Sequence, residues 1–378
     1  MTLHVVQVNC VIDAEDRPPE ALLAAWSTLP LVAEAAARAG VHVTVLSASR
    51  NAAKWRHAGV TYEFVREPRL RAGHGPGLAP WRLAAAAKRL GPAVIHFNGL
   101  DFPLHLRAMC GVGAPVLVQD HANSAASGRD ALRRWGLRHA AAAAFTSAAQ
   151  AEPFRRAGLL AFNLPIHEIA ESSSTFTPGD QEEARQATGV HGDPALLWVG
   201  HLNANKDPLA ILRAVRKALS QVPDLHLWCA FASSDLLPAV LDMLREDPLL
   251  AEHVHLCGKV SRERVEALCR ASDVFVLGSH HEGSGYALIE ALACGLTPVV
   301  SAIPSFRALT GGGAVGALVP VGDVDAFAAA IVAASAKPRL EARAAALGHF
   351  ERTLSPAALG RSLARAYEAV SAGKRRAP

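Results

Sequence analysis

The segment from Ser279 to Gly295 has the residue types of a site for an anionic ligand. It follows an apolar run typical of a buried strand and leads into an apolar, alanine-rich run typical of a helix. Gly283 and Gly285 carry no side chain, so backbone N–H groups can approach a ligand closely. The N-terminus of the following helix adds further N–H groups and a partial positive charge. A diphosphate is an anion that suits this turn.

Two carboxylates flank the turn. Glu282 stands before it, and Glu290 follows eight positions later, about two turns into the predicted helix. Either glutamate alone would be read as an exposed helix residue. A carboxylate, however, can accept two hydrogen bonds, which matches neighbouring hydroxyl groups of a sugar. The two acids and the glycine turn together predict a nucleotide-sugar as the ligand.

The stretch resembles the E-x7-E motif of retaining glycosyltransferases with the GT-B fold, above all family 4. Four further stretches resemble motifs of the same family, in the same order and at similar spacing across residues 196–330. They are LWVGHLNANK at 197–206, ASDVFV at 271–276, GLTPVV at 295–300 and GALVP at 316–320.

The resemblance implies a role for each matching residue. Glu282 would contact hydroxyls of the donor sugar, and Glu290 would hold the ribose hydroxyls. Lys206 would neutralise the diphosphate and stabilise it as the leaving group, which is electrostatic catalysis. The implied donor-binding set is completed by Gly200, His201, Gly283, Ser284, Gly285, Tyr286 and Leu288.

His201 departs from the family pattern, which usually has arginine at this position. Arginine is always charged and can bind phosphate through two parallel hydrogen bonds, whereas an imidazole is smaller and loses its charge near neutral pH. Two interpretations stay open. Either the phosphate is held less tightly and in a pH-dependent way, or another cation compensates.

Two predicted strand ends in the first half carry histidines. His96 and Asn98 lie in a stretch that resembles the family's D-V-V-H-x-H, and His121 follows a stretch that resembles P-V-V-x-T-x-H. The resemblance implies that His121 is a catalytic residue near the donor sugar, where it could donate to a hydroxyl or carry a proton. His96, Asn98 and Asp120 are acceptor-side candidates, although a histidine bonded within the protein is the favoured interpretation of His96. Asp120 could orient His121, but adjacent strand residues point to opposite faces.

Strand-like and helical stretches alternate along the whole chain, which predicts two parallel sheets covered by helices. We expect an α/β fold of two Rossmann-like domains facing across a cleft. The expected boundaries are 1–170 for the acceptor domain, 171–355 for the donor domain, and 356–378 for a C-terminal helix and basic tail, with a polar linker at 171–180. The resemblance implies that this helix crosses back to the first domain. The expected strands are 3–10, 42–47, 61–65, 93–97, 115–119, 142–146, 195–200, 225–231, 253–256, 273–277, 297–300 and 316–319. The expected helices are 20–39, 128–140, 206–219, 235–246, 261–271, 285–294, 323–334, 338–351 and 356–372.

Composition and charge limit the cellular locations and the partners that we expect for this chain. Apolar residues make up 51% of the 378 residues, which is enough for two cores. We expect no transmembrane helix, because no apolar run reaches about 18 residues, and no secretory signal. The six cysteines form no C-x-x-C pair, so they indicate a reducing, cytoplasmic setting. Residues 1–170 hold 18 Lys and Arg against 12 Asp and Glu. This excess could contact an anionic acceptor or the inner membrane face, for example through Arg129, Arg133, Arg134 and Arg138, although a solvated helix face is the simpler interpretation.

These observations favour a retaining glycosyltransferase that moves a sugar from a donor such as a UDP- or GDP-sugar to a hydroxyl acceptor. The acceptor could be a sugar, a lipid-linked molecule or a small molecule, as in cell-surface polysaccharide, glycolipid or secondary-metabolite glycosylation. No metal, cofactor or nucleic acid is expected, because the sequence has no H-E-x-x-H motif and no clustered-carboxylate metal site. Two alternatives stay open: a non-catalytic GT-B protein that binds nucleotide-sugars, and a GT-B nucleotide-sugar epimerase.

Overall fold

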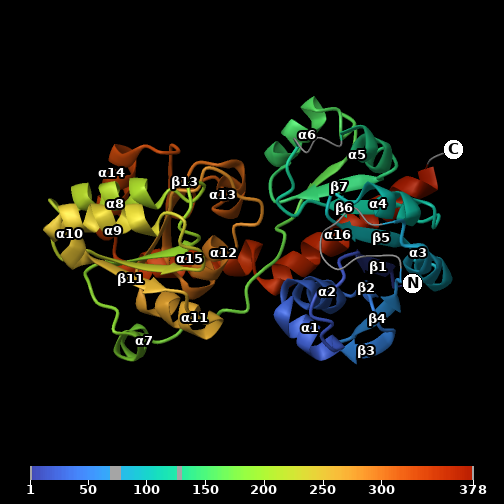
Figure 1. The fold of residues 1–378 in the computed structure, drawn as a ribbon, viewed down its shortest axis with the longest axis horizontal. Helices are drawn as coiled ribbons and strands as arrows, with labels where there is room; N and C mark the ends of the chain where they lie inside the picture. Colours follow the sequence, from blue (N-terminus) through green and yellow to red (C-terminus); the bar gives the residue numbers. More distant parts are fainter. Residues whose placement is uncertain (1, 69–77, 126–129, 377–378) are drawn as a thin grey trace. The chain divides into compact units, whose positions relative to one another are not determined.

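The computed structural model describes residues 2–68, 78–125 and 130–376. The chain forms two compact α/β units, residues 1–173 with 356–378 and residues 174–355. Each unit has its own sheet and its own helices (Figure 1).

Within the described part of the first unit, eight strands form one sheet in the order β3-β4-β2-β1-β5-β6-β7-β8. Neighbouring strands are parallel except for β3 and β4, which form an antiparallel edge pair. The strands are β1 (His4–Asn9), β2 (His42–Ser49), β3 (Ala53–His57), β4 (Val60–Arg66), β5 (Val94–Asn98), β6 (Val116–Gln119), β7 (Ala142–Phe145) and β8 (Ile166–Glu168). The helices are α1 (Pro19–Ala25), α2 (Thr28–Arg38), α3 (Trp81–Leu90), α4 (Pro103–Cys110), α5 (Asp130–Leu137), the 3-10 helix η1 (Ala148–Ala151), α6 (Glu152–Arg156) and α16 (Pro356–Arg376).

Successive residues of β1 enter different cores, as the alternation of a strand requires. Val5 packs with α1, α2 and α16, while Val6 packs on the opposite face with α3, α4, α5 and α6. The C-terminal helix therefore belongs to the first unit and covers one face of its sheet, as expected (Figure 1). Its crossing with α2 is close, because a Cβ on Gly360 would lie 2.1 Å from the Ala35 carbonyl oxygen.

The second unit has six strands among its described residues, all parallel, in the order β11-β10-β9-β12-β13-β14. They are β9 (Ala195–Gly200), β10 (His226–Phe231), β11 (Val254–Gly258), β12 (Val274–Leu277), β13 (Thr297–Ser301) and β14 (Ala317–Val319). The helices are α7 (Gln181–Thr188), α8 (Pro208–Ala218), α9 (Leu237–Glu246), α10 (Pro248–His253), α11 (Arg262–Ala271), α12 (Tyr286–Cys294), α13 (Pro304–Leu309), α14 (Val324–Ser335) and α15 (Arg339–Thr353).

The structure departs from the expected elements in several places. Helices α3, α4, α6, α7, α10 and α13 lie where no helix was named. Two short strands, β3 and β8, lie at the edges of the first sheet where no strand was predicted. The single helix expected over 20–39 is two helices, because the chain leaves helical geometry at Trp26 (φ −106°, ψ 54°). The polar stretch expected to be a linker begins with Glu171, Ser172, Ser173 and Ser174, which are all buried.

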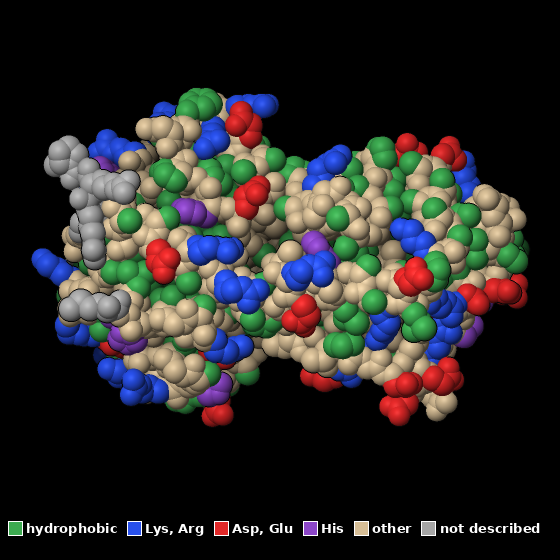
Figure 2. Space-filling model, turned by 180° about the vertical axis from the view of Figure 1, so that it is seen from behind, with side chains coloured by type: hydrophobic (Ala, Val, Ile, Leu, Met, Phe, Trp, Pro, Cys, Tyr) green, Lys and Arg blue, Asp and Glu red, His purple; other side chains and the backbone are tan. Residues whose placement is uncertain are grey.

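Of the four arginines named for a basic helix face, Arg133 is buried, whereas Arg134 and Arg138 are exposed. Arg133 is 2% exposed and pairs with Asp101 at 2.8 Å, because it lies on the inner face of α5. Arg129 and the side chains of the basic tail at 374–378 lie outside the described part. Lys and Arg side chains lie among Asp and Glu side chains on the face shown in Figure 2. Among the described residues, no helix combines the length and apolar character needed to cross a membrane.

Candidate functional site

A pocket of about 380 Å³ lies at the carboxyl ends of β9, β10 and β12 in the second unit. Ligands of open α/β sheets bind at this edge, where loops join strands to helices. Eight of the residues predicted to bind a donor line the pocket: Gly200, His201, Lys206, Glu282, Ser284, Gly285, Tyr286 and Glu290.

The loops after β9 and β12 are tied together beside this pocket. The Asn205 side chain donates to the His281 carbonyl at 3.0 Å and accepts from the His281 N–H at 3.0 Å. This pair brings Lys206 next to Glu282, and the two form an ion pair. The Ser279 hydroxyl donates to the same Glu282 oxygen at 2.8 Å. A cation and a carboxylate are thus positioned together in the pocket.

The glycine turn lies immediately before α12. Gly285 adopts a left-handed conformation (φ 64°) immediately before α12. A Cβ at this position would lie 2.5 Å from Leu309 Cδ1, so only glycine fits without rearrangement. Gly285 is the N-cap residue of α12, and Tyr286 and Ala287 of the first turn of this helix line the pocket. An anion in the pocket would therefore lie at a helix N-terminus.

Glu290 lines the same pocket from the second turn of α12. Its carboxylate pairs with Arg262 Nη1 at 2.7 Å, and the Arg262 guanidinium also lies 4.7 Å from the centre of the Phe176 ring. Burial raises the pKa of Glu290, while Arg262 acts in the opposite direction. Arg262 was not predicted, because its contact to Glu290 joins two helices.

Two predicted donor residues do not line the pocket. The Leu288 side chain is fully buried, because it lies on the core face of α12. The Leu288 N–H donates to the Gly285 carbonyl at 3.0 Å. Gly283 is buried in the turn. Lys259 is a pocket residue that sequence reasoning missed. It directly follows β11, so its place at the end of a predicted strand was the available signal. With Lys206 it gives the pocket two lysines beside His201.

A second pocket of about 370 Å³ lies in the first unit at the carboxyl ends of β1, β5 and β6. Polar side chains from the strand ends and their loops line one part of it, and apolar side chains line the rest. The polar residues are Gln7, Asn9, Asn98, Gln119, His121, Asn123 and Glu171, and the larger apolar ones are Trp26, Leu29, Val32 and Phe102.

Both ring nitrogens of His121 have polar partners in this pocket. Its Nδ1 lies 2.7 Å from Glu171 Oε1, and its Nε2 lies 3.2 Å from Asn98 Oδ1. The imidazole is 34% exposed and the Glu171 side chain 11%. A carboxylate behind one ring nitrogen fixes the orientation of the imidazole. Glu171 was missed because it lies in the stretch predicted to be a linker.

His96 and Asp120, two of the acceptor-side candidates, do not line this pocket. For His96 this agrees with the favoured interpretation of a histidine bonded within the protein. His96 is fully buried, and its Nδ1 lies 2.7 Å from the Tyr367 hydroxyl of α16, away from the pocket. Burial lowers the pKa of His96 to about 4. Asp120 does not bond the His121 ring; its carboxylate accepts from the Asn123 N–H at 3.0 Å, because it points to the other face of the strand end. Burial raises the pKa of Asp120 to about 6.

Solved structures share this fold over nearly the whole chain. Sucrose-phosphate synthase from Thermosynechococcus elongatus aligns with a TM-score of 0.67 over 98% of this chain and 99% of that chain, at 17% identity. HepE from Anabaena, solved in complex with UDP-glucose, aligns with a TM-score of 0.65 over 97% and 100%, at 15% identity. The fold is therefore GT-B, with two Rossmann-like domains.

Sequence comparison assigns the second unit more closely. Residues 180–347, most of the second unit, match the family model described as glycosyl transferases group 1. A D-inositol 3-phosphate glycosyltransferase of Mycolicibacterium gilvum is 34% identical over 161 residues, 41% of this chain and 35% of the relative. A GDP-mannose:cellobiosyl-diphosphopolyprenol alpha-mannosyltransferase of Xanthomonas oryzae is 26% identical over 258 residues, 62% of each chain. The chain thus covers less than two thirds of the length of these relatives.

Proposed function

We propose that this chain is a retaining glycosyltransferase that moves a sugar from a nucleotide-diphosphate sugar to a hydroxyl group of an acceptor. The observation that carries the proposal is the pairing of Lys206 with Glu282 in a pocket that also holds Glu290 and the start of α12. One cation, two carboxylates and a helix N-terminus match the charges of a diphosphate and the hydroxyls of two sugars.

The proposed donor pose follows from these charges. The diphosphate lies at the N-terminus of α12, with Lys206, Lys259 and His201 supplying positive charge. Glu290 accepts hydrogen bonds from the ribose hydroxyls, and Glu282 from hydroxyls of the transferred sugar. These cations do the work that a divalent metal does in other transferases, so we expect no metal requirement in this pocket.

The reaction breaks the bond between the anomeric carbon and the diphosphate oxygen and forms one from that carbon to the acceptor oxygen. The acceptor attacks on the face from which the diphosphate leaves, so the anomeric configuration is retained. The acceptor proton passes to the departing diphosphate oxygen. Lys206 speeds this step because negative charge grows on the diphosphate as the bond breaks.

The pocket of the first unit is the proposed acceptor side. His121, Asn98 and Glu171 offer hydrogen-bonding groups for hydroxyls, and Trp26, Leu29 and Phe102 offer an apolar wall. We propose a sugar, lipid-linked or small-molecule acceptor, as in cell-surface polysaccharide, glycolipid or secondary-metabolite glycosylation. A cytoplasmic location, including the inner membrane face, fits the six free cysteines.

Donor binding and turnover test the proposal together. UDP-, GDP- and ADP-sugars are screened by thermal shift, since a ligand that binds the native state raises its stability. The best donor is then incubated with and without candidate acceptors, and free nucleotide and glycoside are measured. We expect one nucleotide class to stabilise the protein and to be turned over by wild type, with a large loss in Lys206→Ala.

The two alternatives give different results in the same assay. A non-catalytic binding protein would be stabilised by a donor without releasing nucleotide. An epimerase would convert the donor sugar to its epimer without any acceptor. Either result would replace the transferase proposal.

A further inference from the structure

Three histidines from separate segments meet on the second unit, away from the pocket just described. His191 lies in the loop between α7 and β9, His226 begins β10, and His255 lies in β11. One ring nitrogen from each lies within 4.8 Å of the other two. His226 Nδ1 and His255 Nε2 are only 2.9 Å apart.

These distances are close to those of a metal site. Zinc binds imidazole nitrogen at about 2.0–2.1 Å in tetrahedral geometry, which places ligand nitrogens about 3.3 Å from one another. In the cluster, one pair of nitrogens is 2.9 Å apart and all three lie within 4.8 Å of one another, so these distances bracket that separation.

The surroundings orient the rings as the outer shell of a metal site does. His191 Nδ1 lies 3.1 Å from the Gly189 carbonyl oxygen, to which it can only donate. The lone pair of His191 is then on Nε2, and such a bond to the second ring nitrogen is typical of metal-binding histidines. The Trp228 indole donates to the His191 carbonyl at 3.1 Å, and its ring stacks on His255 with centroids 4.1 Å apart.

The loop that carries His191 is held against β10 by its backbone. The Asp193 N–H donates to the Asp224 carbonyl at 2.7 Å, and the His226 N–H donates to the Pro194 carbonyl at 3.2 Å. A Cβ on Gly192 would lie 2.8 Å from His226 Cβ, so glycine permits this close approach.

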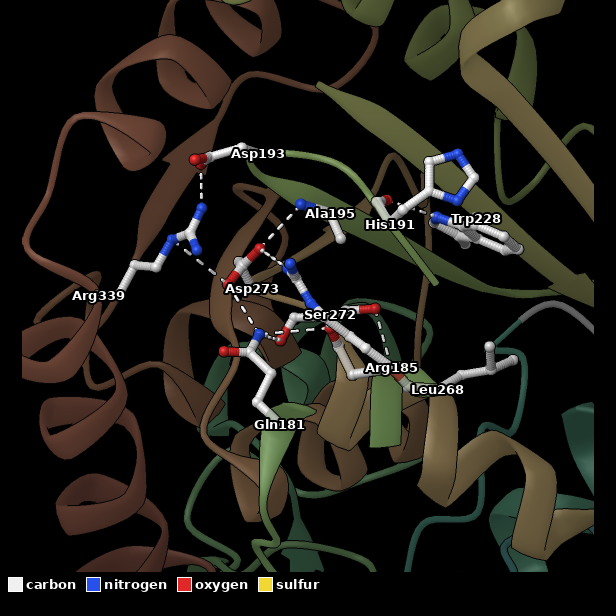
Figure 3. Close-up of polar contacts among 11 residues, drawn as sticks. Gln181, Arg185, His191, Asp193, Ala195, Trp228, Leu268, Ser272, Asp273 and Arg339 are labelled. Atoms are coloured by element: carbon white, nitrogen blue, oxygen red, sulfur yellow. Dashed lines mark hydrogen bonds and ion pairs between the residues drawn. The ribbon is translucent and has the colours of Figure 1, made fainter. Parts of the chain in front are cut away.

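Side chains anchor the far end of the same loop (Figure 3). Arg339 pairs with Asp193, and Asp273 accepts from the Ala195 N–H at 2.8 Å. Asp273 also pairs with Arg185 at 2.9 Å. The loop is therefore preorganised, so that little ordering entropy would oppose metal binding.

The cluster is separate from the donor pocket. His226 is the first residue of β10, while Phe231, its last residue, lines the pocket. Five residues of strand span about 16 Å, so the two sites lie at opposite ends of the same strand. His191 is exposed and the other two histidines are half-buried. The cluster can therefore be reached from solvent.

We propose that His191, His226 and His255 form a binding site for a divalent transition metal, with Zn²⁺ as the matching ion and water as its fourth ligand. These three histidines have no short spacing in the sequence, so only the fold brings them together. Bound metal would link the 189–194 loop to β10 and β11. It would stabilise the second unit without taking part in sugar transfer.

The test uses the full chain without a polyhistidine tag, stripped of metal with a chelator. Zn²⁺ is added in a calorimetric titration, and the melting temperature is measured with and without Zn²⁺. We expect one ion per chain and a rise in melting temperature. His191→Ala and His255→Gln should each weaken binding at least tenfold and remove the rise. His139→Ala is the matched control, since His139 is exposed on the first unit.

His191 is exposed, so its replacement leaves the core intact, and circular dichroism checks that each variant is folded. Absorption of the Co²⁺-loaded protein reports the coordination directly, since four-coordinate Co²⁺ absorbs visible light strongly and octahedral Co²⁺ weakly. Strong absorption that is lost in His191→Ala supports the site. The proposal is overturned if wild type binds no Zn²⁺ or if His191→Ala binds it equally well.

Discussion

The Lys206 ammonium and the Glu282 carboxylate form an ion pair between the loops that follow β9 and β12. Both side chains are largely buried, with exposed fractions of 15% and 12%. Each group therefore needs a partner, since an unpaired buried charge is costly. A donor would satisfy both at once, with its phosphates taking Lys206 and its sugar hydroxyls taking Glu282. The ion pair in the ligand-free protein thus keeps both Lys206 and Glu282 charged until a donor binds.

Replacing Lys206 should reduce catalysis more than donor binding. Lys206→Ala removes the charge that stabilises the leaving diphosphate, so kcat should fall by about 10²–10³. Steady-state transfer kinetics measure the effect. Lys217→Ala is the matched control, because Lys217 pairs with Asp325 on the surface of the same unit. A Lys206→Ala enzyme with near-normal kcat would remove Lys206 from the mechanism.

Replacing Glu290 should weaken donor binding. Glu290→Gln keeps the shape but removes the charge that strengthens hydrogen bonds to the ribose, at a cost of about 1–3 kcal/mol. Calorimetric titration with the best nucleotide gives the affinity. Glu263→Gln on α11 serves as control, since Glu263 is exposed. Equal affinity in folded Glu290→Gln and wild type would contradict the assignment.

The same residue should make donor affinity depend on pH. Burial raises the pKa of free Glu290, and hydrogen bonds from ribose to the carboxylate would lower it in the complex. The binding contribution is then complete above the free-state pKa and is lost as pH falls through the bound-state pKa. Titrations across the acidic range should show this loss in wild type and a flatter profile in Glu290→Gln.

Removing the carboxylate behind His121 should impair turnover without affecting donor affinity. Glu171→Gln weakens the interaction that orients the imidazole, so kcat should fall about 10-fold or more. His121→Asn should have a similar or larger effect, and the double variant should be no worse than His121→Asn, because the two residues act as a pair. Glu152→Gln, which breaks only an exposed pair with Arg156, is the control. Additive losses would show that Glu171 does not act through His121.

Asp120 should lower stability at neutral pH. Burial raises its folded-state pKa to about 6 from an ordinary value of 3.8. A raised pKa contributes stability that is complete below the unfolded-state value and is lost as pH rises through the folded-state value. Asp120→Asn should therefore raise the free energy of unfolding by about 1–3 kcal/mol at pH 7.5, with little change at pH 4. Urea unfolding at both pH values measures this. Asp235→Asn, at an exposed position, should change neither, and a destabilised Asp120→Asn protein at pH 7.5 would contradict the argument.

Two glycines of α16 should respond in opposite ways to the same substitution. At Gly360 a Cβ would lie 2.1 Å from the Ala35 carbonyl oxygen, whereas nothing lies within 4 Å at Gly373. Gly360→Ala should destabilise the first unit by about 1–3 kcal/mol, because α16 must move away from α2. Gly373→Ala should be neutral or slightly stabilising, since alanine favours helix by up to about 1 kcal/mol. Thermal unfolding of both variants gives the comparison, and an equally stable Gly360→Ala protein would place the α2–α16 contact in doubt.

Much of the donor pocket could be predicted from local spacing. Apolar runs placed most strands of both sheets within a residue or two, since burial on a parallel sheet imposes its own pattern. A helix start, a glycine turn and two glutamates eight residues apart are all features of one continuous segment. Gly285, Glu282 and Glu290 lie together because the same turn and helix carry all three. Ligands of open α/β sheets bind at the carboxyl ends of the strands. Lys206 follows the end of a neighbouring strand, so it too could be assigned to the pocket.

Tertiary structure alone decided the contacts between distant segments. Glu171 reaches His121 because the chain returns to the end of β6 just before it leaves the first unit. Arg133 is buried on the inner face of α5, where it pairs with Asp101. His96 is buried beside the hydroxyl of Tyr367 on α16. His191, His226 and His255 meet only because β10 and β11 are neighbours and one loop crosses their ends. Local periodicity determines which face of an element is apolar, but it does not determine which polar side chains of other segments that element meets.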